Sequence, residues 1–134
     1  REDFVAEIAK LTQDRGVDVV LDMVGGSYLA RNIQALAIEG RLLSIATQGG
    51  SKGELDIGRV MQRRLVITGA LLRPRSVEFK RHTRDLLLAR VWPLIEAGKI
   101  KPIVDRVFGL AETAAAHAYM EGGAHKGKII LAAE

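Results

Sequence analysis

Three segments of the sequence have residue types that could bind a ligand through their main chain. Residues 22–27 (DMVGGS), 46–50 (ATQGG) and 70–73 (ALLR) each follow or end an apolar run. In open parallel sheets, ligands bind beyond the carboxyl ends of the strands, where loops and helix N-termini present backbone donors. Glycine would let a ligand approach the main chain closely. We therefore take these segments as the candidate site, with a simple tight turn as the alternative role of Gly25 and Gly26.

The glycine pattern differs from that of a complete dinucleotide-binding domain. Such a domain carries G-x-G-x-x-G after its first strand, and an acidic or basic residue about 20 positions later contacts the ribose. No G-x-G occurs in these 134 residues. The chain alone is therefore not a complete dinucleotide-binding domain, but it could be the second half of one.

Other known sites fit less well. Asp22 stands at the end of an apolar run, where a receiver domain keeps its phospho-acceptor, but the acidic pair for magnesium is missing and Lys101, followed by proline, is a poor match for the later lysine. A methyltransferase-like sheet fits the strand pattern and lacks its glycine-rich first loop. The three histidines have no H-x-x-x-H spacing, and no serine lies in G-x-S-x-G, so we expect surface or packing roles for them.

The elements that would position the candidate site alternate between strands and helices, as in an α/β protein with a parallel sheet. Proline at position 93 predicts a kink in the longest helix. Ser27 is a candidate N-cap for a helix that closes at Gly40, and Leu55, Val60, Met61 and Trp92 are expected core residues. The predicted helices are 2–15, 27–40, 55–63, 77–97 and 111–120, and the predicted strands are 17–24, 41–46, 65–72, 101–108 and 128–132. The last strands either extend the first sheet or form a different one.

Composition bounds the function further. With 48% hydrophobic and 27% charged residues, the chain should bury a single core rather than form two independent domains. The absence of cysteine excludes disulfides, thiolate metal sites and cysteine nucleophiles within these residues. No apolar stretch reaches the roughly 20 residues of a membrane span, so we expect a cytoplasmic protein. Because the sequence begins with Arg1 instead of Met, we expect it to be a piece of a longer protein.

The whole chain carries a net charge of +4, and its basic residues concentrate in one segment. Eight arginines and lysines lie between positions 59 and 84, where Glu78 is the only acid. Nucleic-acid surfaces usually interleave aromatic residues, and only Phe79 lies in this stretch. The pattern favours solvated helix faces over a nucleic-acid surface.

Taken together, the strand ends resemble a known family. Residues 17–46 (VDVVLDMVGGSYLARNIQALAIEGRLLSIA), 66–76 (VITGALLRPRS) and 92–131, ending in HKGKIIL, resemble the C-terminal half of zinc-independent medium-chain dehydrogenases/reductases. They look most similar to NAD(P)H:quinone oxidoreductases of the p53-inducible and zeta-crystallin type. The order and spacing of D-x-x-G-G, LLRPRS and HKGKIIL carry the resemblance, which covers essentially the whole chain.

This resemblance implies a fold and a division into domains. Residues 1–98 would form the later part of a Rossmann-type, doubly wound parallel sheet that binds NAD(P), and residues 99–134 a C-terminal segment returning to the catalytic, GroES-like domain. The glycine-rich pyrophosphate loop would lie upstream of Arg1. The cofactor-binding residues that it implies are Val24 and Gly25 at the ribose, Ile45, Ala46, Thr47 and Gln48 along the middle of the dinucleotide, Leu71, Leu72 and Arg73 at the nicotinamide, and Lys126 near a phosphate.

The implied activity is hydride transfer from NADPH, with NADH as the alternative cofactor, to a quinone or other electrophilic alkene. No residue of this chain is an obvious proton donor, and we expect these residues alone to be inactive. Family members commonly dimerise through the strand that corresponds to residues 65–72. The alternatives are an enoyl or alkene reductase of the same superfamily, or a non-catalytic nucleic-acid-binding or dimerisation module.

Overall fold

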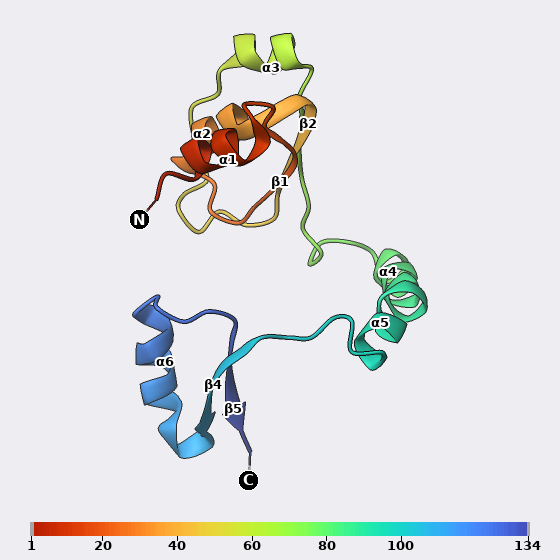
Figure 1. The fold of residues 1–134 in the computed structure, drawn as a ribbon. Helices are drawn as coiled ribbons and strands as arrows, with labels where there is room; N and C mark the ends of the chain where they lie inside the picture. Colours follow the sequence, from red (N-terminus) through yellow and green to blue (C-terminus); the bar gives the residue numbers. More distant parts are fainter. Residues whose placement is uncertain (1, 134) are drawn as a thin grey trace. The chain divides into compact units, whose positions relative to one another are not determined.

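The computed structural model describes residues 2–133. The chain divides into two compact units with the boundary between residues 75 and 76 (Figure 1). Each unit has a parallel sheet of its own. The expectation of one core is therefore wrong, because no strand of the second unit joins the first sheet. The predicted domain boundary at residue 98 concerns a longer protein and stays a prediction.

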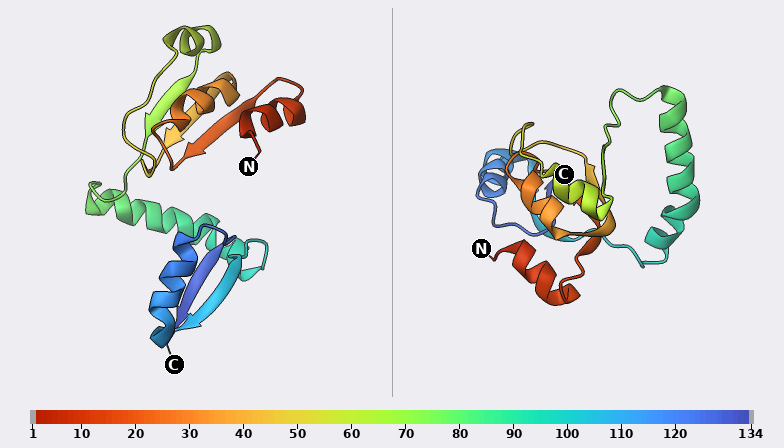
Figure 2. Two further views of the ribbon diagram at one scale, coloured as in Figure 1. Left: turned by 90° about the vertical axis from the view of Figure 1, so that its left-hand side faces the viewer. Right: turned by 90° about the horizontal axis from the view of Figure 1, so that it is seen from above.

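The first unit is an α/β layer. Its sheet has the order β1 (Val17–Asp22), β2 (Leu36–Ser44), β3 (Val66–Gly69), and all neighbours are parallel. Three helices alternate with the strands: α1 (Phe4–Thr12), α2 (Tyr28–Ala35) and α3 (Ile57–Arg63). Parallel strands end at the same edge of a sheet, so the segments after Asp22, Ser44 and Gly69 come together there, as Figure 2 shows.

A small apolar core joins the helices to the sheet. The side chains of Ile33, Leu36 and Leu42 are completely buried, and Val60 of α3 packs against them. Met61, expected in the core, is 73% exposed, and Leu55 is also exposed. Those two predictions were wrong: Met61 lies on a side of α3 that does not face the sheet, and Leu55 precedes the helix, which begins at Ile57.

The junction between α2 and β2 differs from the predicted helix 27–40. The helix ends at Ala35, and Leu36 already pairs with Val17 in the sheet. Ser27 forms no side-chain cap, because the carbonyls of Gly25 and Gly26 accept the first amides of the helix instead.

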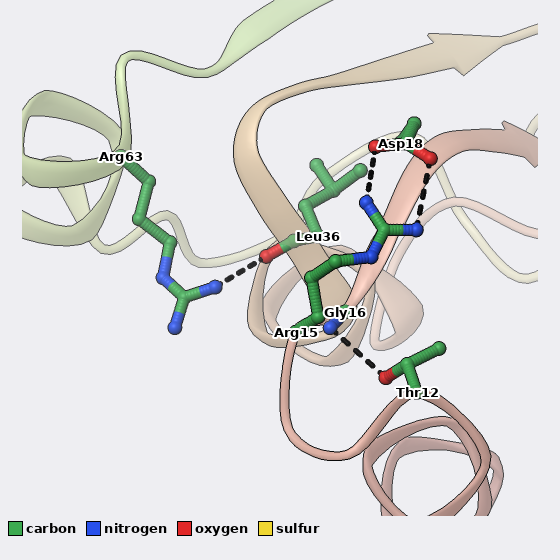
Figure 3. A network of polar contacts seen from close by, with 6 residues as sticks. All are labelled: Thr12, Arg15, Gly16, Asp18, Leu36 and Arg63. Carbon is green, nitrogen blue, oxygen red and sulfur yellow. Dashed lines mark hydrogen bonds and ion pairs between the residues drawn. The ribbon is translucent and has the colours of Figure 1, made fainter.

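Arginines of α3 bind the carbonyl groups at the end of α2. Arg63 donates to the Leu36 oxygen at 2.7 Å (Figure 3), and Arg59 donates to the oxygen of Gln34 at 2.8 Å. These charged donors satisfy carbonyls that a helix leaves unpaired at its C-terminus. Gly16 lies under the same junction at φ +85°, where a Cβ atom would stand 2.7 Å from the Ala35 oxygen.

The second unit contains α4 (Val77–Arg90), α5 (Trp92–Glu96), β4 (Val104–Gly109), the short 3₁₀ helix η1 (Leu110–Glu112), α6 (Thr113–Glu121) and β5 (Lys128–Ala132). Its two strands form a separate parallel pair, which confirms the second of the two sheet arrangements considered. The break between α4 and α5 confirms the kink expected at Pro93. Trp92 is 51% exposed, so its predicted core role is wrong. Within residues 2–133, no helix is long and apolar enough to cross a membrane.

Candidate functional site

The carboxyl edge of the first sheet is organised by Asp22, the last residue of β1. Its side chain is only 4% exposed. Oδ1 accepts hydrogen bonds from the main-chain N–H of Val24 at 2.8 Å and of Gly25 at 3.0 Å. The buried carboxylate is therefore engaged in holding the turn after β1, which does not favour the phospho-acceptor alternative.

Two glycine-containing loops interlock at this edge, main chain against main chain. The N–H of Gly49 donates to the Val24 oxygen at 2.7 Å. Gly25 and Gly26 have φ angles of +65° and +51°, and a Cβ atom on Gly26 would approach the Gly49 oxygen to 2.4 Å. Such angles and such close contact both require glycine. Gly25 and Gly26 thus make the turn and also let the second loop pack against it.

A hollow of about 570 Å³ opens beside these loops, between the ends of β2 and β3. This volume lies within the roughly 300–1,000 Å³ typical of small-molecule sites. Four of the predicted cofactor-binding residues line it together: Ile45, Ala46, Thr47 and Leu71. Ala70, which belongs to the predicted segment 70–73, also lines the hollow. The sequence did not indicate four further lining residues close to the predicted segments, Ser44, Gly69, Pro74 and Arg75.

The walls of the hollow offer main-chain donors more than reactive side chains. Among the described residues, the N–H groups of Ala46 and Thr47 donate to no backbone carbonyl. Arg75 is the one charged residue among those that line it in the described part of the chain. The arrangement could bind and orient a ligand, and the described residues that line it include no carboxylate or imidazole for proton transfer.

The remaining predicted site residues lie elsewhere. Val24, Gly25 and Gln48 belong to the interlocked loops, where the N–H of Gln48 donates to the Met23 oxygen. Leu72 and Arg73 follow the hollow-lining Leu71 without lining the hollow themselves. Lys126 lies in the second unit, in the loop before β5. Cofactor binding by all ten residues stays a prediction.

The basic segment between positions 59 and 84 is partly engaged within the chain. Arg59 and Arg63 bind the end of α2, Arg64 pairs with Glu39 at 3.0 Å, and Arg84 pairs with Asp85 at 2.6 Å. These contacts give several of its charges a structural role. Residues 2–133 also contain no cluster of three or more His, Cys, Asp or Glu that could hold a metal ion.

Comparison with known proteins places this chain in a family. The profile described as zinc-binding dehydrogenase matches residues 1–131. The chain belongs to this family. It is thus a member of the medium-chain dehydrogenase/reductase superfamily, whose NAD-binding Rossmann-like region accounts for the parallel sheet. The narrower zeta-crystallin type stays a prediction, as does independence of zinc.

Proteins named for different oxidoreductase activities are similar to this chain. Quinone oxidoreductase-like protein 2 of Bos taurus is 29% identical over 92% of the chain, which spans 35% of that protein. The 2-haloacrylate reductase of Burkholderia sp is 30% identical over 97% of the chain and 39% of its own length. A crystal structure of an NAD-dependent alcohol dehydrogenase superposes with a TM-score of 0.72 at 27% identity, covering 100% of the chain and 36% of that structure. The chain therefore spans little more than a third of these relatives.

Proposed function

We propose that this chain supplies part of the cofactor site of a longer NADPH-dependent quinone oxidoreductase, with NADH as the alternative cofactor. The observation that carries the proposal is the hollow at the carboxyl edge of the sheet, which is lined by Ile45, Ala46, Thr47 and Leu71. This edge is where doubly wound sheets bind dinucleotides. The similarity to a quinone oxidoreductase-like protein supports the proposed activity, and the similarity to an NAD-dependent alcohol dehydrogenase supports a nicotinamide cofactor.

The residues of the chain fit a nicotinamide cofactor through shape and main-chain polarity. When bound, the cofactor supplies a hydride from nicotinamide C4. The N–H groups of Ala46 and Thr47 would donate to its polar groups, and the apolar Ile45 and Leu71 would exclude water from it. We assign Leu72 and Arg73 to the nicotinamide end. This chain would contribute by orienting the cofactor toward the substrate. Orientation alone can lower the activation barrier of hydride transfer substantially, without a proton donor.

Val24, Gly25 and Gln48 complete the proposed cofactor contacts in this unit. Val24 and Gly25 are assigned to the ribose because the turn after β1 adjoins the second loop through the Gly49–Val24 hydrogen bond. Gln48 is assigned to the middle of the dinucleotide. Asp22 is expected to hold this turn in place, and it does not itself contact the cofactor.

A second candidate function is reduction of an activated alkene, as in an enoyl reductase. The similarity to 2-haloacrylate reductase favours it. A haloacrylate and a quinone both contain a carbon–carbon double bond conjugated to a carbonyl or carboxylate group. Both are therefore electrophilic and can accept a hydride. The two functions therefore share the cofactor site proposed here and differ in the substrate pocket.

We also propose that the protein forms a homodimer through β3. This strand lies at the edge of its sheet, and Val66 and Ile67 are 45% and 40% exposed. An apolar edge strand with unpaired backbone groups is a ready partner for a second copy. Sedimentation equilibrium of the protein with and without NADPH tests this proposal, and a monomer under both conditions would exclude it.

Gly69 offers a direct test of the hollow. It lines the hollow, its φ lies outside the left-handed region, and a Cβ atom would meet only the Ser44 oxygen at 3.4 Å. Gly69→Leu should fill the hollow and weaken NADPH binding by about tenfold or more, whereas the matched Gly69→Ala should change it little. Fluorescence titration with NADPH measures both in a longer protein that contains this chain.

Activity assays separate the candidate functions. The longer protein and these 134 residues are compared for NADPH oxidation with 1,4-benzoquinone and with 2-chloroacrylate. Oxidation with the quinone supports the first candidate, and oxidation with 2-chloroacrylate alone supports the second. If neither NADPH nor NADH binds, or if Gly69→Leu binds the cofactor as tightly as Gly69→Ala, the cofactor site proposed here is wrong.

A further inference from the structure

One charged side chain lies at the hollow between the ends of β2 and β3. Among the described residues that line this hollow, Arg75 is the only charged one. A guanidinium group keeps its positive charge at every physiological pH. No carboxylate belongs to the same walls in the described part of the chain, so the lining as a whole is positively charged. The hollow should therefore attract a negatively charged group of a ligand in preference to a neutral one.

The main chain holds Arg75 at the end of a short segment that follows β3. The N–H of Ala70 donates to the Ser44 oxygen at 3.0 Å, which continues the pairing of β2 and β3 by one residue. The N–H of Arg75 donates to the Leu72 oxygen at 3.2 Å and closes a tight turn. Pro74 within that turn restricts the backbone further, because its ring fixes φ at about −65°. The guanidinium is therefore carried by a backbone that is held at two points, as a binding residue requires.

Main-chain donors accompany the guanidinium in the walls of the hollow. Among the described residues, the N–H groups of Ala46, Thr47 and Leu71 donate to no backbone carbonyl, and all three residues line the hollow. Carboxylate and phosphate oxygens accept several hydrogen bonds at once, and a guanidinium group can donate two of them in parallel. A set of N–H donors together with one guanidinium therefore matches an oxyanion better than it matches an uncharged carbonyl.

We propose that Arg75 is an anion-binding residue, which holds a carboxylate or a phosphate of the ligand that occupies the hollow. This inference rests on the proposed function, because that function supplies the ligand. It adds a charged contact to the shape and main-chain polarity on which that function depends. Lysine should be a weak substitute at this position, because an ammonium group lacks the planar fork of donors that matches an oxyanion.

Two parts of the reacting complex carry such an anion. An unsaturated acid that accepts the hydride has a carboxylate, and the dinucleotide has phosphates. If the carboxylate is bound, Arg75 selects unsaturated acids over quinones, which have no anionic group. If a phosphate is bound, Arg75 belongs to the cofactor site and acts on every substrate alike. The two sources therefore differ in whether the effect of Arg75 depends on the substrate.

Anion binding is tested without any cofactor, by NMR titration of the 134-residue chain. The amide signals of Thr47 and Leu71 should shift with 2-chloroacrylate or with inorganic phosphate, and little with the uncharged 2-chloroacrylamide. Arg75→Gln should weaken the response to the anion by about tenfold or more, and Arg75→Lys should lie between Arg75→Gln and wild type. Arg15→Gln is the matched control, because Arg15 pairs with Asp18 and does not line the hollow. If neither anion shifts these signals, or if Arg75→Gln responds like wild type, the proposal is wrong.

The source of the anion is identified in the longer protein. If a carboxylate is bound, Arg75→Gln should raise the KM for 2-chloroacrylate about tenfold and leave the KM for 1,4-benzoquinone and the Kd for NADPH unchanged. If a phosphate is bound, Arg75→Gln should raise the Kd for NADPH, measured by fluorescence, about tenfold. If all three constants stay at their wild-type values, the proposal is overturned. If wild type binds neither NADPH nor NADH, the proposed function fails, while the titration of the 134-residue chain still decides whether Arg75 binds an anion.

Discussion

Replacing Asp22 by alanine should loosen the interlocked loops at the carboxyl edge of the first sheet. The substitution removes the carboxylate that accepts hydrogen bonds from the N–H groups of Val24 and Gly25. Because Asp22 is almost fully buried, its own oxygens are not easily replaced by water. The turn after β1 would then lose its internal support, although its sequence is otherwise unchanged.

The size of the effect follows from the two amides. A donor left without its partner costs about 1–3 kcal/mol, and the lower end applies here because the turn lies near the surface. Two amides together give about 2 kcal/mol, which corresponds to a roughly 30-fold increase in the population of the opened loop. Asp22→Asn can keep the Oδ1 acceptor, but it loses the charge and the weaker 3.2 Å contact of Oδ2 with the Gly25 N–H. It should therefore cost about 1 kcal/mol, or roughly fivefold.

The reporter is an amide that Asp22 does not contact. The N–H of Gly49 donates to the Val24 oxygen across the two loops, and its exchange reports their separation. NMR-detected exchange at Gly49 should rank Asp22→Ala above Asp22→Asn above wild type, while the N–H of Lys128 in the second unit stays constant. If Gly49 is equally protected in all three proteins, Asp22 does not hold the loops together.

Three further substitutions probe the first unit. Gly16→Ala should lower the free energy of unfolding by about 2–4 kcal/mol, because the new Cβ would clash with the end of α2 at a φ of +85°; urea denaturation followed by circular dichroism measures it. Arg63→Ala should cost about 1 kcal/mol by the same assay through loss of the bond to the Leu36 oxygen, and Arg63→Gln, which keeps a donor, should cost less. The Arg15 guanidinium lowers the pKa of Asp18, so this pair stabilises the fold above about pH 4 and the contribution is lost as the pH falls through the lowered pKa. Asp18→Asn should therefore reduce the loss of ellipticity on acidification, and an unchanged acid titration would contradict the pairing.

Two strands were predictable because their residue types favour strands locally. Residues 17–24 and 128–132 are short runs rich in apolar and β-branched side chains, and the structure places β1 and β5 within them. The periodicity predicted one helix over residues 77–97, and Pro93 predicted the kink at which the structure separates α4 from α5, since proline cannot continue a helix with its hydrogen bonds intact. In these segments, the secondary structure that the residue types favour locally is the one that the structure has.

The boundary between α2 and β2 could not be read in the same way. Residues 36–40 continue a helical spacing, but Leu36 is buried in the sheet. Its carbonyl and that of Gln34 accept hydrogen bonds from arginines more than twenty residues away. Such contacts between distant parts of the chain override local propensity. The predicted cap at Ser27 does not form for a related reason. The carbonyls of Gly25 and Gly26 accept the hydrogen bonds from the first helical N–H groups that the Ser27 hydroxyl was expected to accept.

The candidate site was predictable in position but not in construction. The rule that ligands bind beyond the carboxyl ends of parallel strands selects segments that the structure brings to one edge of the sheet, and Ile45, Ala46, Thr47 and Leu71 line one hollow there. The interlocking of the two glycine loops depends on tertiary packing, whereas the sequence indicated close approach of a ligand or a tight turn for these glycines. The contacts of Asp105 with the Tyr119 hydroxyl and the Lys126 N–H also escaped the sequence, because a register shift in one strand leaves no periodic signal.

A site built mainly from main-chain groups explains why this chain lacks a familiar catalytic motif. The donors that we assign to the cofactor are the amides of Ala46 and Thr47, and every residue except proline supplies the same group. The positions at which such a site restricts the residue type are those that shape the backbone. Gly26 is one of them, because a Cβ atom added there would collide with the Gly49 oxygen. Gly26→Ala should therefore impair NADPH binding more than Thr47→Ala, although Thr47 lines the hollow and Gly26 does not.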